Sequence, residues 1–143
     1  MAQFLDTLHD EHEMVKGLFE KIEAADTGAA KEKLFSQLRH ELMPHMKGEE
    51  KYFYPALKEK QDYKEDVLEA VEEHHAARLI LNELEDMSPD EDHWDAKMSV
   101  LKEMVEHHIE EEEENIFKEA REALSEERMK KIAESFESEK SRV

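Results

Sequence analysis

The chain has 143 residues, of which 39 are acidic and 20 basic, giving a formal net charge of −19 at pH 7. This acidic excess argues against a nucleic acid or an anionic membrane surface as partner, because phosphate groups would repel it. The absence of cysteine excludes disulfides, thiolate catalysis and Cys-based metal sites. No run approaches the ~20 apolar residues of a membrane span, and no signal peptide opens the chain. We therefore expect a cytoplasmic protein that forms one domain over residues 1–143.

Apolar side chains recur every three or four residues along nearly the whole chain, which indicates amphipathic helices. The first expected helix carries its inward stripe over residues 5–22 and is followed by a break around Gly28. The second carries its stripe over residues 34–53 and ends at Pro55 or soon after. Pro44 lies inside this second helix, where it removes a backbone hydrogen bond. We expect a local bend there.

The third expected helix has its stripe over residues 67–84 and stops near Met87. The next residues are a typical start of a fourth helix. Ser88 is a good N-cap, Pro89 suits the first helical position, and Glu91 would complete a capping box. The sequence thus predicts a short connection between the third and fourth helices.

The fourth helix has its stripe over residues 94–116, and a shorter fifth helix over about 125–138 begins after Ser125. Four amphipathic helices with short connections fold most simply as an antiparallel up-down-up-down bundle. We therefore predict an all-α fold, with a four-helix bundle over about residues 4–120. The fifth helix is expected to close one end of it.

Each of the four long stripes contains a histidine, and two of them add a glutamate one turn later. The histidines are His12, His45, His74 and His108, and the glutamates are Glu49 and Glu112. Glu112 belongs to a run of five glutamates, but at 100° per residue it lies only about 40° from His108 around the helix. Most of the run is thus predicted to face solvent, whereas Glu112 points inward.

An internal repeat supports this assignment. The segment from His45 aligns with the segment from His108, so that Glu49 matches Glu112. The apolar positions that follow the histidines of the first and third helices also match. Two similar helical hairpins related by a pseudo-twofold axis would bring all six polar groups to one level of the core.

Such a set of buried groups is unfavourable without a cation, because an unpaired carboxylate in an apolar interior has a large desolvation penalty. Two carboxylates shared by four imidazoles suit a pair of divalent ions, with each carboxylate bridging. Nitrogen and oxygen ligands without sulfur indicate iron, manganese or zinc. Iron fits best if open positions meet oxygen.

These residues carry a resemblance to a known family. The pattern consists of His12, His45-x-x-x-Glu49, Glu73-His74 and His108-x-x-x-Glu112. It resembles the HHE cation-binding domain of the hemerythrin family over roughly residues 4–120. The resemblance implies a four-helix bundle around two non-haem iron ions, bridged by the two glutamates. It also implies that the histidines of the first two helices serve one iron and those of the last two the other.

The family's oxygen carriers bind O₂ at an open iron position and have a further histidine on the third helix, one turn from its partner. Here the positions one turn from His74 hold Ala70 and Arg78, so that histidine is missing. Whether His9, His75 or Glu73 replaces it is left open at this point. Fewer imidazoles leave more open positions, which favours reaction, sensing or metal exchange over a stable oxygen adduct.

Our leading hypothesis is a di-iron binding protein that interacts with O₂, peroxide or nitric oxide in sensing, scavenging or iron handling. The alternative is a di-iron enzyme, such as a peroxidase or a donor that repairs iron centres, and a third reading is a purely structural helical module. Zinc and manganese remain alternatives to iron, and the oligomeric state is not predicted. Tyr52 and Tyr54 flank Glu49, where one of them could line the pocket, but core packing is the favoured interpretation; His107 is interpreted as a surface or supporting residue.

Overall fold

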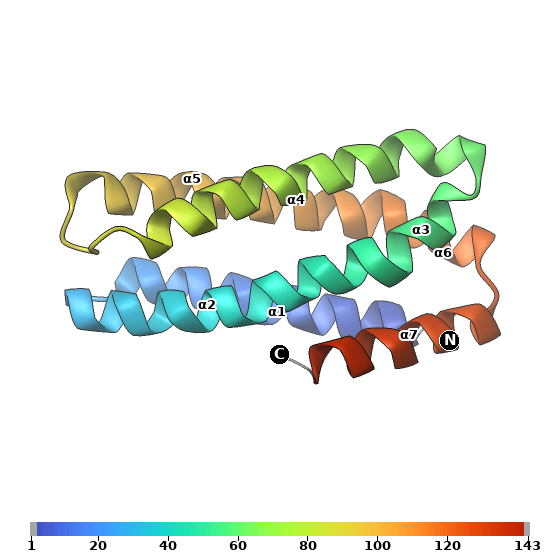
Figure 1. Cartoon of the computed structure of the whole chain (residues 1–143), viewed down its shortest axis with the longest axis horizontal. Helices are drawn as coiled ribbons and strands as arrows, with labels where there is room; N and C mark the ends of the chain where they lie inside the picture. The colour runs from blue at the N-terminus through green and yellow to red at the C-terminus, as the bar shows by residue number, and fades with distance from the viewer. Residues whose placement is uncertain (1–2, 142–143) are drawn as a thin grey trace.

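The protein is described by a computed structural model that covers residues 3–141. Four long helices dominate it: α1 (Gln3–Ala24), α2 (Gly28–Gly48), α4 (Lys64–Glu85) and α5 (Asp92–Glu111). Helices α1 and α2 form one hairpin and α4 and α5 the other, and the two hairpins lie side by side (Figure 1). Within residues 3–141 there is no strand. The predicted all-α, up-down-up-down bundle is therefore confirmed.

Helices α2 and α5 each continue into a π-helical segment. These segments are η1 (Glu49–Phe53) and η3 (Glu112–Ile116), and they lead into the short helices α3 (Tyr54–Lys58) and α6 (Phe117–Ala123). Both π segments begin at one of the two glutamates that align in the internal repeat. The hairpins thus repeat not only in sequence but in this rare backbone form, which often marks a functional position. Helix α2 runs through Pro44 without ending, and its geometry changes only at Glu49.

The start of the fourth long helix differs from the expectation. Helix α5 begins at Asp92 with Glu91 as its N-cap, and residues 88–91 form a turn instead. The Glu91 carboxylate accepts from the Ser88 N–H at 2.6 Å, and Ser88 Oγ accepts from the Asp90 N–H at 3.2 Å. These are the predicted capping contacts, but they close a turn here, and the regular helix begins three residues after Pro89.

The fifth predicted helix is α7 (Glu126–Lys140), reached from α6 through a short connection. Ser125 is its N-cap, as expected, and accepts from the Arg128 N–H at 3.1 Å. The helix does not lie across the end of the bundle. It runs alongside α1 and α2 and contacts η1 (Figure 1). Between α3 and α4 the chain forms a 3₁₀ turn, η2 (Gln61–Tyr63).

The buried apolar side chains fall into two clusters with a polar layer between them. One cluster fills the half of the bundle near η1, η3 and α7, and contains Phe53, Tyr54 and Phe136. The other fills the half near the α1–α2 and α4–α5 connections, and contains Phe19 and Trp94.

No helix in the described part of the chain is both long and apolar enough to cross a membrane.

Candidate metal centre

The six side chains expected to bind metal all lie in the polar layer between the two apolar clusters. They are His12, His45, Glu49, His74, His108 and Glu112. None is more than 8% exposed, and both glutamates are completely buried. The helical periodicity is sufficient to place them on inward faces, because each lies one or two turns from the core residues of its own helix.

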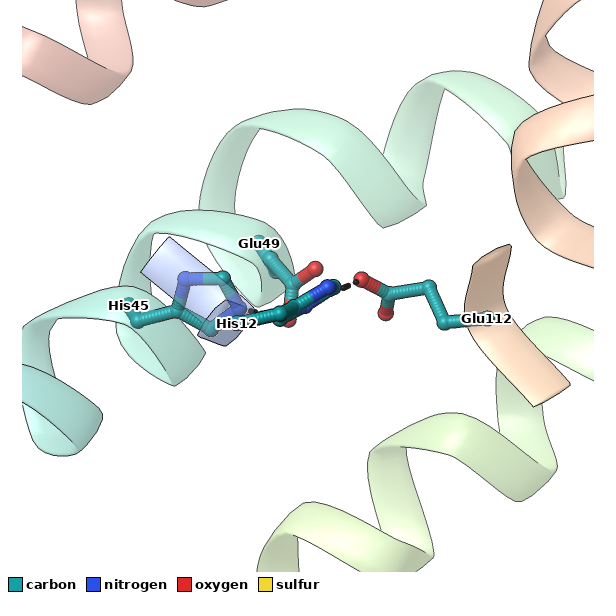
Figure 2. Close-up of side chains that lie close together, drawn as sticks. All are labelled: His12, His45, Glu49 and Glu112. Atoms are coloured by element: carbon teal, nitrogen blue, oxygen red, sulfur yellow. Dashed lines mark ion pairs between the residues drawn. The ribbon is translucent and has the colours of Figure 1, made fainter. Parts of the chain in front are cut away.

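The six residues form two groups of four that share both glutamates. One group adds His12 and His45 (Figure 2), and the other adds His74 and His108. Within each group the ligand atoms all lie within 4.8 Å of one another. The imidazole rings of the two pairs have centroids 4.9 Å and 4.7 Å apart, so the two halves are nearly equivalent.

Every histidine directs its Nε2 atom towards a glutamate oxygen at 3.2 or 3.3 Å. The pairs are His45–Glu49, His74–Glu49, His12–Glu112 and His108–Glu112. Each glutamate therefore faces one histidine from each half of the layer, as a bridging carboxylate must.

Several of these inward atoms lack a hydrogen-bond partner. His12 Nε2 and Glu112 Oε1 lie 3.3 Å apart, yet neither makes a hydrogen bond, and Glu49 Oε2 also has no partner among the described residues. Buried polar atoms are almost always satisfied in native proteins. The residues present therefore fit a pair of divalent ions, which would satisfy these nitrogen and oxygen atoms.

Comparison with known proteins agrees with this geometry. The family model described as hemerythrin HHE cation binding domain matches residues 3–120. The chain belongs to the hemerythrin HHE cation-binding family. The match covers the four long helices and all six residues of the polar layer, whereas α7 lies outside it.

Two other proteins are similar to this hemerythrin-like chain. A crystal structure of a hemerythrin HHE cation binding domain-containing protein from Mycobacterium kansasii is 25% identical, with a TM-score of 0.77. The likeness covers 96% of this chain and 86% of that one. A protein of Nostoc sp. named DNA nickase is 25% identical over 139 residues, which are 96% of this chain. This chain spans only 39% of the length of the Nostoc protein.

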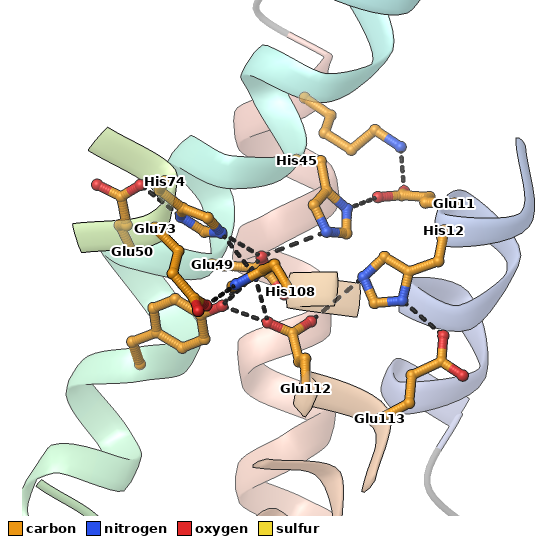
Figure 3. Close-up of polar contacts among 12 residues, drawn as sticks. Glu11, His12, His45, Glu49, Glu50, Glu73, His74, His108, Glu112 and Glu113 are labelled. Carbon is orange, nitrogen blue, oxygen red and sulfur yellow. Dashed lines mark hydrogen bonds and ion pairs between the residues drawn. The ribbon is translucent and has the colours of Figure 1, made fainter. Parts of the chain in front are cut away.

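In this hemerythrin-like centre the outward Nδ1 atoms of the four histidines each contact a carboxylate at 2.6 or 2.7 Å (Figure 3). The pairs are His45–Glu11, His74–Glu50, His108–Glu73 and His12–Glu113. Each carboxylate comes from the helix next to that of its histidine, and together they close a ring around the bundle. A carboxylate on Nδ1 fixes the ring orientation and leaves Nε2 free for a metal.

The same carboxylates set the protonation of the centre when no cation is present. Burial lowers the pKa of His45, but the charge of Glu49 and the hydrogen bond with Glu11 outweigh it and raise that pKa well above 6.5. Burial also opposes charge on His108, yet Glu112 and Glu73 raise its pKa to about 10. Protons on these imidazoles thus neutralise the buried carboxylates, and a binding cation would release them.

Tyr54 belongs to the apolar core, as the sequence favoured, and it also contacts the candidate centre, which was the alternative. Its hydroxyl donates to Glu112, lies 3.3 Å from Glu49 Oε1 and is 3.4 Å from His108 Nε2. Burial, followed by the charge of Glu112, raises the pKa of Tyr54 well above 10 and keeps the phenol protonated. In an α-helix Tyr54 would lie about 140° from Glu49. It shares the inward face only because η1 is π-helical, with a wider turn.

The three candidates for the missing histidine lie elsewhere. His9 pairs with Glu113 at 2.9 Å near the surface, His75 is exposed, and Glu73 holds His108 from outside. Three further supporting residues were not singled out: Glu11, Glu50 and Glu113. These three glutamates could have been found from the sequence, because each directly precedes or follows a residue of the polar layer. A helical neighbour is turned by about 100° and so faces the adjacent helix.

Proposed function

We propose that the chain binds two non-haem iron ions through the six residues of the polar layer. One ion would be held by His12 and His45, the other by His74 and His108, with both glutamates shared. The observation that carries this proposal is the pair of overlapping four-residue groups, three of whose inward atoms have no hydrogen-bond partner among the described residues. Nitrogen and carboxylate donors without sulfur are compatible with iron, manganese and zinc.

We further propose that the loaded centre interacts with O₂, peroxide or nitric oxide. An iron pair with open positions would supply reversible one-electron chemistry and a binding position for such small ligands. A cavity of about 20 Å³ borders all four histidines of the polar layer and is otherwise lined mainly by apolar side chains, among them Val15, Ala77 and Val105. Its volume suits about one water-sized molecule. This cavity supports a small ligand and disfavours a larger organic substrate.

The chain's own residues have defined tasks in this proposal. The four outer carboxylates hold the imidazoles in one orientation, and the apolar clusters on either side exclude bulk water. Tyr54 provides an additional oxygen near the His74–His108 half, where the family's further histidine is absent. The phenol also holds a proton at the bridging Glu112, which favours the alternative of a di-iron enzyme that turns over peroxide.

The proposal does not extend to DNA. The word nickase belongs to a relative of which this chain spans 39%. A net charge of −19 opposes contact with a phosphate backbone.

Metal analysis tests the proposal most directly. Protein purified gently from iron-sufficient cells is expected to contain two iron ions per chain and to show ferric absorption in the near ultraviolet, which a zinc pair lacks. Almost no bound metal would overturn both the binding and the enzymatic versions, and a zinc-only sample with no iron uptake would overturn the choice of iron. A peroxide assay then separates the two versions, because a binding protein reacts stoichiometrically whereas an enzyme continues to turn over.

A further inference from the structure

The four carboxylates that orient the histidines differ on their outer sides. Three of them carry a basic partner there: Lys140 on Glu11, Arg78 on Glu50, and His9 on Glu113. Among residues 3–141, Glu73 forms no ion pair with a lysine or arginine. The outer basic group near Glu73 is instead the exposed imidazole of His107, one atom of which lies within 4.8 Å of a Glu73 oxygen.

A polar groove of about 180 Å³ lies beside Glu73, between α4 and the end of α5 with η3. The protein adds more acids there. The groove is lined by five carboxylates, from Asp66, Glu69, Glu73, Glu111 and Glu112, and by no lysine or arginine. Clefts lined by one sign of charge focus the field and concentrate counter-ions. This groove therefore attracts cations.

The inner end of the groove belongs to the metal centre. His108 and Glu112 line it. Glu112 is completely buried and its Oε1 atom has no hydrogen-bond partner, while His108 is the most exposed of the six residues of the polar layer, at 8%. The groove thus leads from solvent to a buried carboxylate of the candidate centre.

Beside the groove, two of its lining acids, Glu73 and Glu111, form a mixed set of donors with the exposed His107. One ligand atom each from Glu73, His107 and Glu111 lies within 4.8 Å of the others. The Nε2 atom of His107 is 3.1 Å from Glu111 Oε1, and the His107 side chain is 64% exposed. An imidazole with two carboxylates can hold a first-row divalent ion that keeps part of its water shell.

We propose that this groove is the route by which a divalent cation reaches the centre, and that Glu73, His107 and Glu111 bind it first. The inference rests on the proposed function and adds a path to it. Glu73 joins the two sites, because it belongs to the outer donor set and also contacts His108 Nδ1 at 2.6 Å. A cation held at the outer site is thus already beside a ligand of the His74–His108 half.

The test uses the variant His107→Gln/Glu111→Gln, which changes neither the six residues of the centre nor their four orienting carboxylates. Stopped-flow mixing of ferrous iron with metal-free protein gives the loading rate, and metal analysis gives the final content. We expect loading about tenfold slower than in the unmodified chain, the low end of electrostatic focusing effects, with two ions bound at equilibrium. The matched control is His40→Gln/Glu20→Gln, which removes an exposed histidine and an exposed carboxylate elsewhere. It should load at the normal rate.

Each of the other outcomes would contradict either the route, the outer site or the proposed function. An unchanged loading rate in the groove variant, or an equal slowing in the control, would overturn the route while leaving the proposed function intact. Loss of bound iron at equilibrium would show that the outer pair belongs to the centre itself. Failure of the unmodified chain to bind iron would instead refute the proposed function. Manganese(II) titration of iron-loaded protein, followed by electron paramagnetic resonance, should reveal one further weak site that disappears in the groove variant. Its absence from the unmodified chain would overturn the outer site.

Discussion

The two halves of the candidate metal centre have the same donors but different surroundings. Tyr54 and Phe117 occupy matching positions after η1 and η3. Tyr54 places a hydroxyl in the His74–His108 half, whereas Phe117 only stacks on His12, at 6.1 Å between ring centroids. The repeat therefore determines which groups can bind metal. Its departures from symmetry determine which other side chains contact each half of the centre.

Helix α7 adds a second difference. It covers the His12–His45 half, where the Phe136 ring lies 6.2 Å from that of His45 and Lys140 bonds Glu11. The His74–His108 half instead borders the acidic groove. Because the family match ends at residue 120, the cover is contributed by a segment outside the matched domain. One half of the centre is thus closed and the other accessible.

The largest effect is expected from a change at one of the two glutamates that both halves share. Glu112→Ala should lose both ions together and destabilise the protein by about 3–5 kcal/mol, because it leaves buried charged imidazoles unpaired. Metal analysis and urea unfolding measure the two effects. The matched change on one half, His74→Ala, should leave the His12–His45 pair intact and retain part of the metal. A Glu112→Ala protein with two ions and an unchanged unfolding midpoint would show that this glutamate is not a bridge.

The cover over the closed half can be displaced through Gly48. A Cβ atom at Gly48 would lie 2.5 Å from ring carbons of Phe136, which is completely buried. We expect Gly48→Ala to lower the free energy of unfolding by about 1–3 kcal/mol through overpacking. Gly17→Ala is the control, since a Cβ there has nothing within 4 Å. It should stabilise helix α1 by about 0.5–1 kcal/mol. Equal stability of the two variants in urea would show that α7 does not pack as described.

Substituting the basic residues that pair with the orienting carboxylates should lower the metal affinity of each half separately. Lys140→Met frees Glu11 behind His45, and Arg78→Met frees Glu50 behind His74. We expect each variant to lose roughly tenfold in affinity for one ion, the low end for residues that support a ligand. Chelator competition measures the affinity, and anomalous scattering from partly loaded crystals identifies the emptied position. Emptying of the same position in both variants would contradict the separation of the halves.

The smallest effect concerns the pH dependence of stability near the accessible half. Burial, together with the neighbouring Asp66, raises the pKa of Glu119 to about 8. The folded state then retains a proton that the unfolded chain loses near pH 4.5, so this group makes the free energy of unfolding fall as pH rises from about 4.5 to 8. Glu119→Gln should remove this dependence and stabilise the protein at pH 8 by about 0.5 kcal/mol, since solvent screens the partly exposed carboxyl. Urea unfolding at pH 4.5 and pH 8 measures the difference. If the free energy of unfolding of the variant at pH 8 equals that of the unmodified chain, Glu119 does not destabilise the folded state at that pH.

The apolar periodicity was sufficient to predict the four long helices, and helical geometry was sufficient to select Glu112 from its run of glutamates. The start of α5 at Pro89 was wrong, since residues 88–91 form a turn and the helix begins at Asp92, although the capping contacts between Ser88 and Glu91 form as predicted. Metal binding by the six residues stays a prediction. For Tyr54 the sequence favoured the core over the pocket. Tyr54 is buried in the apolar cluster and also contacts Glu112, because the π-helical segment η1 changes the angle of the residues that follow it.

The sequence by itself determined which side chains face inward, since the position of a residue around a regular helix depends only on its number. It thereby determined the donor set of the candidate centre. The tertiary structure alone decided how neighbouring helices complete that set: which carboxylate meets which imidazole, where α7 lies, and where the groove opens. These features depend on contacts between segments far apart in the chain, and local periodicity carries no information about such contacts.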